Sequence, residues 1–194
     1  MLQSEAIRIL YRKKAALFDI AGAKKLFSVE KDNTLYKILQ RLERKGVIVR
    51  LTSGKYRFAF REANEFETAN FLLSPSYVSF ESALSFHGVL AQFPYTITSA
   101  TPLKSRKLVC EDREYEYSHI EKKYYFGFVR KDTLLVAEPE KALLDQLYFM
   151  SKKLRQVHVE DLDLARVSSR KLKRYARKFN YLPLNNLIDR LGLC

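Results

Sequence analysis

One stretch, residues 32–60, constrains the fold of this chain more than any other. Its sequence is DNTLYKILQRLERKGVIVRLTSGKYRFAF, and its first half places Leu or Ile at positions 35, 38, 39 and 42. Apolar residues three and four apart predict a helix with one buried side, and Gly46 is the residue type that ends such a helix. Two runs typical of strands follow, separated by a tight turn. The stretch therefore predicts a helix followed by a β-hairpin.

The residues before this stretch supply the other elements of an N-terminal domain. Ser4 begins a predicted helix, residues 15–18 form a short strand, and Asp19 caps a second helix. The whole order is helix, strand, helix, helix, strand, turn and strand, which is the order of a winged helix-turn-helix. We predict that this domain covers residues 1–62, because the polar segment that follows interrupts the strand pattern.

The side chains outside the apolar stripe indicate what this domain binds. The predicted helix carries hydroxyl, amide and cationic groups on its exposed flanks, and the hairpin adds three cations. Such a helix suits the DNA major groove, and the hairpin cations suit phosphates or the minor groove. A solvated surface is the alternative for any single basic helix. The candidate DNA-binding residues are Asn33, Thr34, Lys37, Gln40, Arg41, Arg44, Lys45, Arg50, Lys55 and Arg57.

The distribution of charge favours a polyanionic partner. The chain has 194 residues and a net charge of +13. Residues 1–60 carry 14 Lys and Arg against 5 Asp and Glu, residues 61–150 carry 10 against 13, and residues 151–194 carry 11 against 4. The second basic end is either a solvated surface or a contact to nucleic acid or to an acidic protein. The candidate residues of this C-terminal basic surface are Arg166, Arg170, Lys173, Arg174, Arg177 and Lys178.

Residues 63–194 predict a second domain that mixes helices with an antiparallel sheet. Helices are expected from Ser79 to Gly88 and from Pro139 onward, and basic helices end the domain. Between them lie five runs typical of strands, and their spacing of about ten residues is typical of antiparallel sheets. The predicted fold class is α+β. The strand-like runs are 95–99, 106–110, 115–120, 124–129 and 133–137.

No pattern of residues indicates catalysis or a metal site. His87 lies on an apolar helical face and is interpreted as a hydrogen-bonded core histidine, and Asp161 and Asp163 as helix-capping or solvated acids. The phosphate-binding and nucleophile motifs are absent. We therefore expect a protein that is not an enzyme, with no catalytic residues, no metal and no cofactor. The sequence shows no signal peptide or membrane span, so a cytoplasmic location is expected, with no membrane partner.

Three segments in the second domain resemble a known family. They are SPSYVSFESALSFHGVL at 74–90, YYFGF at 124–128 and AEPEKALLDQLYF at 137–149. Together with the predicted winged helix, they resemble the AbiEi antitoxin family, which comprises predicted transcriptional regulators of bacterial phage-defence (abortive infection) systems. Neither of the two longer motifs is a catalytic fingerprint.

The resemblance implies a role for each domain. The winged helix is expected to repress the protein's own promoter by binding double-stranded DNA, and the C-terminal domain to neutralise a toxin. The partner implied is a nucleotidyltransferase-like toxin, countered as in type IV toxin–antitoxin systems without a required stable complex. Two alternatives remain open: a stand-alone winged-helix regulator whose C-terminal domain senses a ligand or dimerises, and an RNA-binding or nucleotide-modifying enzyme.

Overall fold

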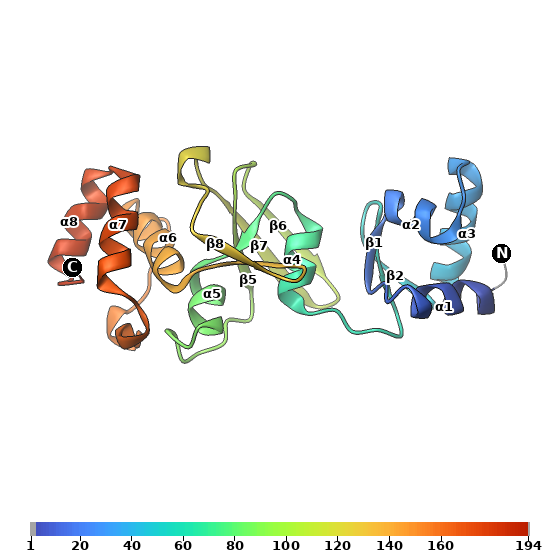
Figure 1. The fold of residues 1–194 in the computed structure, drawn as a ribbon, viewed down its shortest axis with the longest axis horizontal. Coiled ribbons are helices and arrows are strands. Elements are labelled where there is room, and N and C mark those ends of the chain that lie inside the picture. Colours follow the sequence, from blue (N-terminus) through green and yellow to red (C-terminus); the bar gives the residue numbers. More distant parts are fainter. Residues whose placement is uncertain (1–2, 194) are drawn as a thin grey trace. The chain divides into compact units, whose positions relative to one another are not determined.

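The computed structural model describes residues 3–193 and shows an α+β fold. Over these residues the chain forms eight α-helices and two β-sheets. It divides into two compact units, Met1–Leu72 and Leu73–Cys194 (Figure 1). The boundary predicted after residue 62 lies earlier in the chain, and the helix α4 (Glu65–Leu72) between the two positions belongs to the N-terminal unit.

In the N-terminal unit, three helices gather on one side of a three-stranded sheet (Figure 1). The strand order is β1-β3-β2, and both pairings are antiparallel. The elements are α1 (Gln3–Arg12), β1 (Leu17–Asp19), α2 (Ile20–Phe27), α3 (Asp32–Arg44), β2 (Ile48–Thr52) and β3 (Lys55–Phe58).

Local sequence explains these elements. The predicted apolar stripe of α3 is confirmed, since Leu35, Ile38, Leu39 and Leu42 are all buried. Asp19 caps α2 as predicted, because its side chain accepts a hydrogen bond of 2.7 Å from the backbone N–H of Gly22. Gly46 follows α3 with a φ of 66°, the left-handed conformation that glycine adopts without strain.

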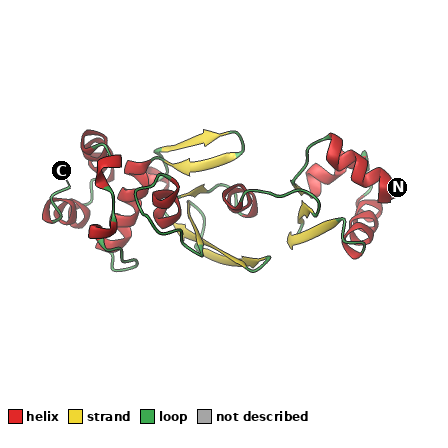
Figure 2. Ribbon diagram, turned by 90° about the horizontal axis from the view of Figure 1, so that it is seen from below, coloured by secondary structure: helices red, strands yellow, loops and turns green. Residues whose placement is uncertain are grey.

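The C-terminal unit packs helices against a six-stranded sheet of order β6-β7-β5-β4-β9-β8. Helices α6, α7 and α8 lie together at one end of this unit (Figures 1 and 2). Its elements are β4 (Tyr77–Val78), α5 (Phe80–Phe86), β5 (Ile97–Thr101), β6 (Arg106–Cys110), β7 (Arg113–His119), β8 (Phe128–Lys131), β9 (Leu134–Ala137), α6 (Pro139–Ser151), α7 (Ser169–Phe179) and α8 (Leu182–Arg190), with short 3-10 turns at Lys122–Tyr124, Val159–Asp161 and Leu164–Arg166.

The prediction of an antiparallel sheet is wrong, because the larger sheet is mixed. Strands β5 and β7 pair in parallel, as do β4 and β9. β6 and β7 form a hairpin, and β7 rather than β6 lies next to β5. Since β6 reverses the chain before β7 begins, β7 runs in the same direction as β5. Spacing along the chain predicts that strands form but not the order in which they pair.

The strand predicted at 124–129 is also wrong, since β8 begins only at Phe128. Gly127 before it has a φ of 74°, which interrupts an extended strand. A Cβ atom at Gly127 would lie 3.0 Å from Cγ of Lys141 and 3.1 Å from a ring atom of Tyr175. Glycine is therefore required here by both the backbone conformation and the close packing.

Helix α6 forms the centre of the C-terminal unit. Its first turn contains Pro139, and Leu143, Leu144 and Leu147 are fully buried as predicted. The same helix also buries charged residues, and two of them, Lys141 and Asp145, have no exposed side-chain area. The unit therefore has an ion pair inside its core.

Two smaller predictions concern possible site residues. The Nε2 atom of His87 donates a hydrogen bond of 2.8 Å to the carbonyl oxygen of Ala137, which confirms the predicted hydrogen bond, but the side chain is only half-buried and is not a core residue. Asp163 accepts a hydrogen bond from the backbone N–H of Ala165, which confirms its capping role. Between residues 3 and 193, no group of three or more His, Cys, Asp or Glu side chains is arranged to hold a metal ion. Over the same residues, no helix combines the length and hydrophobicity that a membrane span requires.

Candidate nucleic-acid interfaces

Helix α3 presents a polar surface that the rest of its unit leaves open. The apolar stripe occupies the side that faces the core. All the remaining residues of the helix are exposed. The predicted residues on and just after α3 are all exposed, and none of their side chains forms a hydrogen bond or ion pair with another residue in the described chain. They are Asn33, Thr34, Lys37, Gln40, Arg41, Arg44 and Lys45.

The hairpin contributes one further exposed cation, Arg50 on β2. It lines a concave surface of about 340 Å³ between α3 and the hairpin, together with Tyr36, Lys37, Gln40, Glu43 and Tyr56. Burial raises the pKa of the Tyr56 hydroxyl, and the charge of Arg50 opposes this shift. The surface therefore combines aromatic rings, an amide and charges of both signs.

Lys55 and Arg57 do not extend from the hairpin in the way the sequence predicts. The Nζ atom of Lys55 donates hydrogen bonds of 2.5 and 3.0 Å to the carbonyl oxygens of Phe71 and Leu72, which end α4. Burial lowers the pKa of Lys55, partly offset by the charge of Asp19. Nη1 of Arg57 donates to the carbonyl oxygen of Phe58 at 3.2 Å. Both cations already bind backbone carbonyls within their own unit, so we assign neither a phosphate contact.

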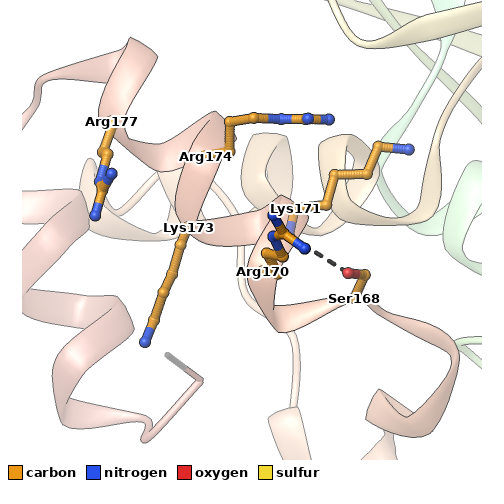
Figure 3. Close-up of a pocket in the computed structure, with 6 residues that line it drawn as sticks. All are labelled: Ser168, Arg170, Lys171, Lys173, Arg174 and Arg177. Atoms are coloured by element: carbon orange, nitrogen blue, oxygen red, sulfur yellow. Dashed lines mark hydrogen bonds between the residues drawn. The ribbon is translucent and has the colours of Figure 1, made fainter.

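A second basic surface lies on α7, where side chains surround a pocket of about 640 Å³ (Figure 3). Lys171 and Arg174 extend to one side of the helix, and Lys173 and Arg177 to the other (Figure 3). Arg170, Lys173 and Arg177 are exposed, and their side chains have no hydrogen bond or ion pair among the described residues. We call this pocket the α7 pocket. It is lined by Ser168, Arg170, Lys171, Lys173, Arg174 and Arg177.

The structure brings together only some of the cations predicted for this surface. Arg166 lies outside the α7 pocket and pairs with Asp163 at 2.9 Å. Lys178 also lies outside it, with its Nζ atom 4.8 Å from the centre of the Phe126 ring. The sequence predicts Ser168 or Ser169 as the cap of this helix and Lys171 as one of its cations, but the predicted site residues include neither Ser168 nor Lys171. The signal for Ser168 is its residue type just before a helix, where its side chain accepts a hydrogen bond from the N–H of Lys171.

Lys171 is a fixed member of the α7 pocket. Its Nζ atom lies 2.8 Å from a carboxylate oxygen of Glu138 and 3.4 Å from one of Glu140. Burial lowers the pKa of Lys171, but the hydrogen bond to Glu138 and the two carboxylate charges raise it overall. The hydroxyl of Tyr175 donates a bond of 2.5 Å to the other oxygen of Glu138. These contacts attach α7 to the start of α6.

The two longer segments of the family resemblance, 74–90 and 137–149, meet inside the C-terminal unit. Nζ of Lys141 pairs with Asp145 and donates a hydrogen bond of 2.8 Å to the Tyr77 hydroxyl. Asp145 accepts hydrogen bonds from the hydroxyls of Tyr77 at 2.9 Å and Ser79 at 2.8 Å. Burial lowers the pKa of Lys141 and raises that of Asp145, and the charge of each partner opposes the shift. All four residues are buried, so this network joins β4 and α5 to α6 without reaching solvent.

No model of a known protein family matches this chain, and no curated protein matches it.

Proposed function

We propose that the protein is a DNA-binding transcriptional repressor whose N-terminal unit is a winged helix-turn-helix. The order α1-β1-α2-α3-β2-β3, with an antiparallel sheet of order β1-β3-β2, supports this interpretation. The observation that carries the proposal is the outer surface of α3, where seven polar or cationic side chains lack partners among residues 3–193. In this proposal α3 enters the major groove of double-stranded DNA at the protein's own promoter.

Phosphate contacts and base contacts contribute differently to such binding. Each cation that neutralises a DNA phosphate releases condensed counterions, so affinity falls steeply as salt concentration rises. Hydrogen bonds to base edges then add the sequence preference. Arg50 lies beside α3 and provides a phosphate contact from the hairpin. Lys55 and Arg57 stabilise the unit and take no part in binding.

The test compares two variants that each remove three positive charges. One carries Lys37→Gln, Arg41→Gln and Arg44→Gln on α3. The other carries Arg170→Gln, Lys173→Gln and Arg177→Gln on α7, and serves as the matched control. Gel shifts on the promoter duplex should show a loss of about 100-fold or more for the α3 variant, because each base or phosphate contact is worth about 1–3 kcal/mol. Unchanged binding by the α3 variant would remove this helix from the proposal.

We further propose that the protein is the antitoxin of a type IV toxin–antitoxin system and counters a nucleotidyltransferase-like toxin. The resemblance of its three C-terminal segments to the AbiEi family supports this role. The C-terminal unit is assigned the neutralising function, and the exposed cations of the α7 pocket are its candidate contact surface. Neutralisation in this proposal does not require a stable complex with the toxin.

The antitoxin role is tested by growth rescue. The neighbouring open reading frame is expressed as the toxin, and the full chain is supplied from a foreign promoter. Wild type and the α3 variant both keep the exposed cations of the α7 pocket, so both should restore growth. The α7 variant lacks these cations and should not restore growth. If the wild type gives no rescue, the antitoxin role fails. If the α7 variant rescues fully, the neutralising surface lies elsewhere.

The α7 pocket also favours a second candidate function, a stand-alone repressor that senses an anionic ligand. Its volume of about 640 Å³ is within the range of small-molecule sites, and all the residues that line it except Ser168 are cationic. A neighbouring gene that shows no toxicity, together with promoter binding that changes when an anionic metabolite is added, would favour this candidate.

A further inference from the structure

We propose that four residues of α3, Asn33, Lys37, Gln40 and Arg44, form the base-reading ridge of this protein and recognise purines. The inference rests on the proposed DNA binding and adds to it which side chains read bases, and which bases they select. The burial pattern of α3 provides the first step of the argument.

The buried stripe fixes the rotational position of every other residue on α3. An α-helix turns by about 100° per residue, so the side opposite the four buried residues can be located. Asn33, Lys37, Gln40 and Arg44 are spaced four, three and four residues apart and follow one line along that opposite side. This line points directly away from the core, toward the floor of any groove that the helix enters.

The remaining exposed residues occupy the two flanks. The helical rotation places Tyr36 and Glu43 on the flank nearer the hairpin. Both line the concave surface shared with Arg50 and Tyr56, and Lys37 and Gln40 at the adjoining edge of the ridge line it as well. Thr34 and Arg41 lie on the other side of the ridge, where a helix in the major groove meets the phosphate backbone. Arg41 is thus assigned a phosphate rather than a base.

The chemistry of the ridge alternates between amides and cations. Asn and Gln form paired hydrogen bonds with the N6 and N7 atoms of adenine, and Arg and Lys with the O6 and N7 atoms of guanine. From Asn33 to Arg44 the helix rises about 16 Å, which is about five base pairs at 3.4 Å each. Along the ridge, the side chains therefore prefer adenine and guanine by turns over a site of about five base pairs. Each preferred purine can belong to either strand of the duplex.

Nothing in the described chain competes for these side chains. None of the four forms a hydrogen bond or ion pair with another described residue, and all four are exposed. Substitutions in the ridge therefore break no hydrogen bond or ion pair among the described residues.

The experiment selects bound duplexes from a random-sequence pool with the full-length protein. Wild type should enrich a site containing adenine and guanine contacts. Gln40→Ala should reduce the preference at one adenine by about tenfold or more and leave the other positions unchanged. Gln40→Glu should change that preference from adenine to cytosine, because a carboxylate accepts from the N4 amino group of cytosine. The control, Arg41→Ala, should weaken binding to all sequences equally and reduce the salt dependence.

The outcomes separate this inference from the proposed function. If wild type binds no duplex and enriches no site, the proposed DNA binding fails. If wild type enriches a site but Gln40→Ala and Gln40→Glu keep its base preferences, the ridge does not read bases and the inference is overturned. A change of base preference caused by Arg41→Ala would also overturn it, because the flank would then be the reading surface.

Discussion

Helices α3 and α7 have similar sequence patterns, but their units hold them by different contacts. Each buries an apolar side and exposes a row of cations. Helix α3 is attached through its apolar stripe, and its exposed cations have no partners within residues 3–193. Helix α7 is attached by its apolar side and also by Lys171 and Tyr175, which both bind Glu138 at the start of α6. Part of the charge on α7 is therefore structural.

The difference decides which substitutions report on binding. Neutralising the exposed cations of α3 removes ligand contacts without breaking any contact inside the unit. On α7 the same is true only of Arg170, Lys173 and Arg177, whereas replacing Lys171 also removes two of the ion pairs that hold this helix against the start of α6. A basic helix read from sequence gives no sign of this distinction.

The largest expected effect concerns Lys141, which lies in the helix that supports α7. Replacing Lys141 by Met leaves Asp145 as an unpaired buried acid, which should lower the free energy of unfolding of the C-terminal unit by about 3–5 kcal/mol. The N-terminal unit, whose core consists of apolar residues, should be unaffected. Urea denaturation of the full chain, followed by hydrogen exchange in each unit, measures both effects.

A double variant provides the control for this prediction. Replacing Lys141 by Met and Asp145 by Asn together removes both charges and keeps an oxygen that accepts from the hydroxyls of Tyr77 and Ser79, so most of the lost stability should return. If Lys141→Met alone costs less than about 1 kcal/mol, the buried pair is not what stabilises α6.

A smaller effect is expected at Glu138, the residue that attaches α7. Glu138→Gln replaces charged hydrogen bonds from Lys171 and Tyr175 by neutral ones and should lower the free energy of unfolding by about 1 kcal/mol. Burial raises the pKa of Glu138, but the hydrogen bonds from Lys171 and Tyr175 lower it overall below its ordinary value of 4.5. The stabilisation is therefore complete above pH 4.5 and is lost as the pH falls through the lowered pKa.

Thermal melting of wild type and Glu138→Gln across this pH range tests the assignment. The difference between the two proteins should be largest near neutral pH and should shrink in acid, because protonated Glu138 no longer attracts Lys171. A difference that grows in acid would contradict the role given to this carboxylate.

The smallest effect is expected for α3. The variant with Lys37, Arg41 and Arg44 replaced by Gln should change the free energy of unfolding by no more than about 0.5 kcal/mol, since these side chains contact nothing else in the unit. Denaturation of this variant beside wild type measures the change. A loss above about 1 kcal/mol would show that α3 depends on its charges as α7 does, and the comparison between the two helices would fail.

Local sequence by itself determined much of this protein. Helix α3 and its buried side, the hairpin after Gly46 and the leucine-rich side of α6 all follow from the spacing of apolar residues and the position of glycine or proline. These features are local, because a period of 3.6 residues or a left-handed glycine needs no distant partner. The exposed positions of α3 follow from the same period, so this part of the candidate site was predictable.

The partners of the charged residues were decided only by the tertiary structure. Lys55 and Lys37 have the same side chain, yet Lys55 binds the carbonyl groups that end α4 while Lys37 remains exposed. Lys141 is buried because Asp145 and Tyr77 surround its ammonium group, and Tyr77 is far from it in sequence. The mixed order of the large sheet likewise depends on which strands meet after the chain has folded. Periodicity fixes which side of an element is apolar, but whether a charge meets solvent or a partner depends on residues brought together from distant parts of the chain.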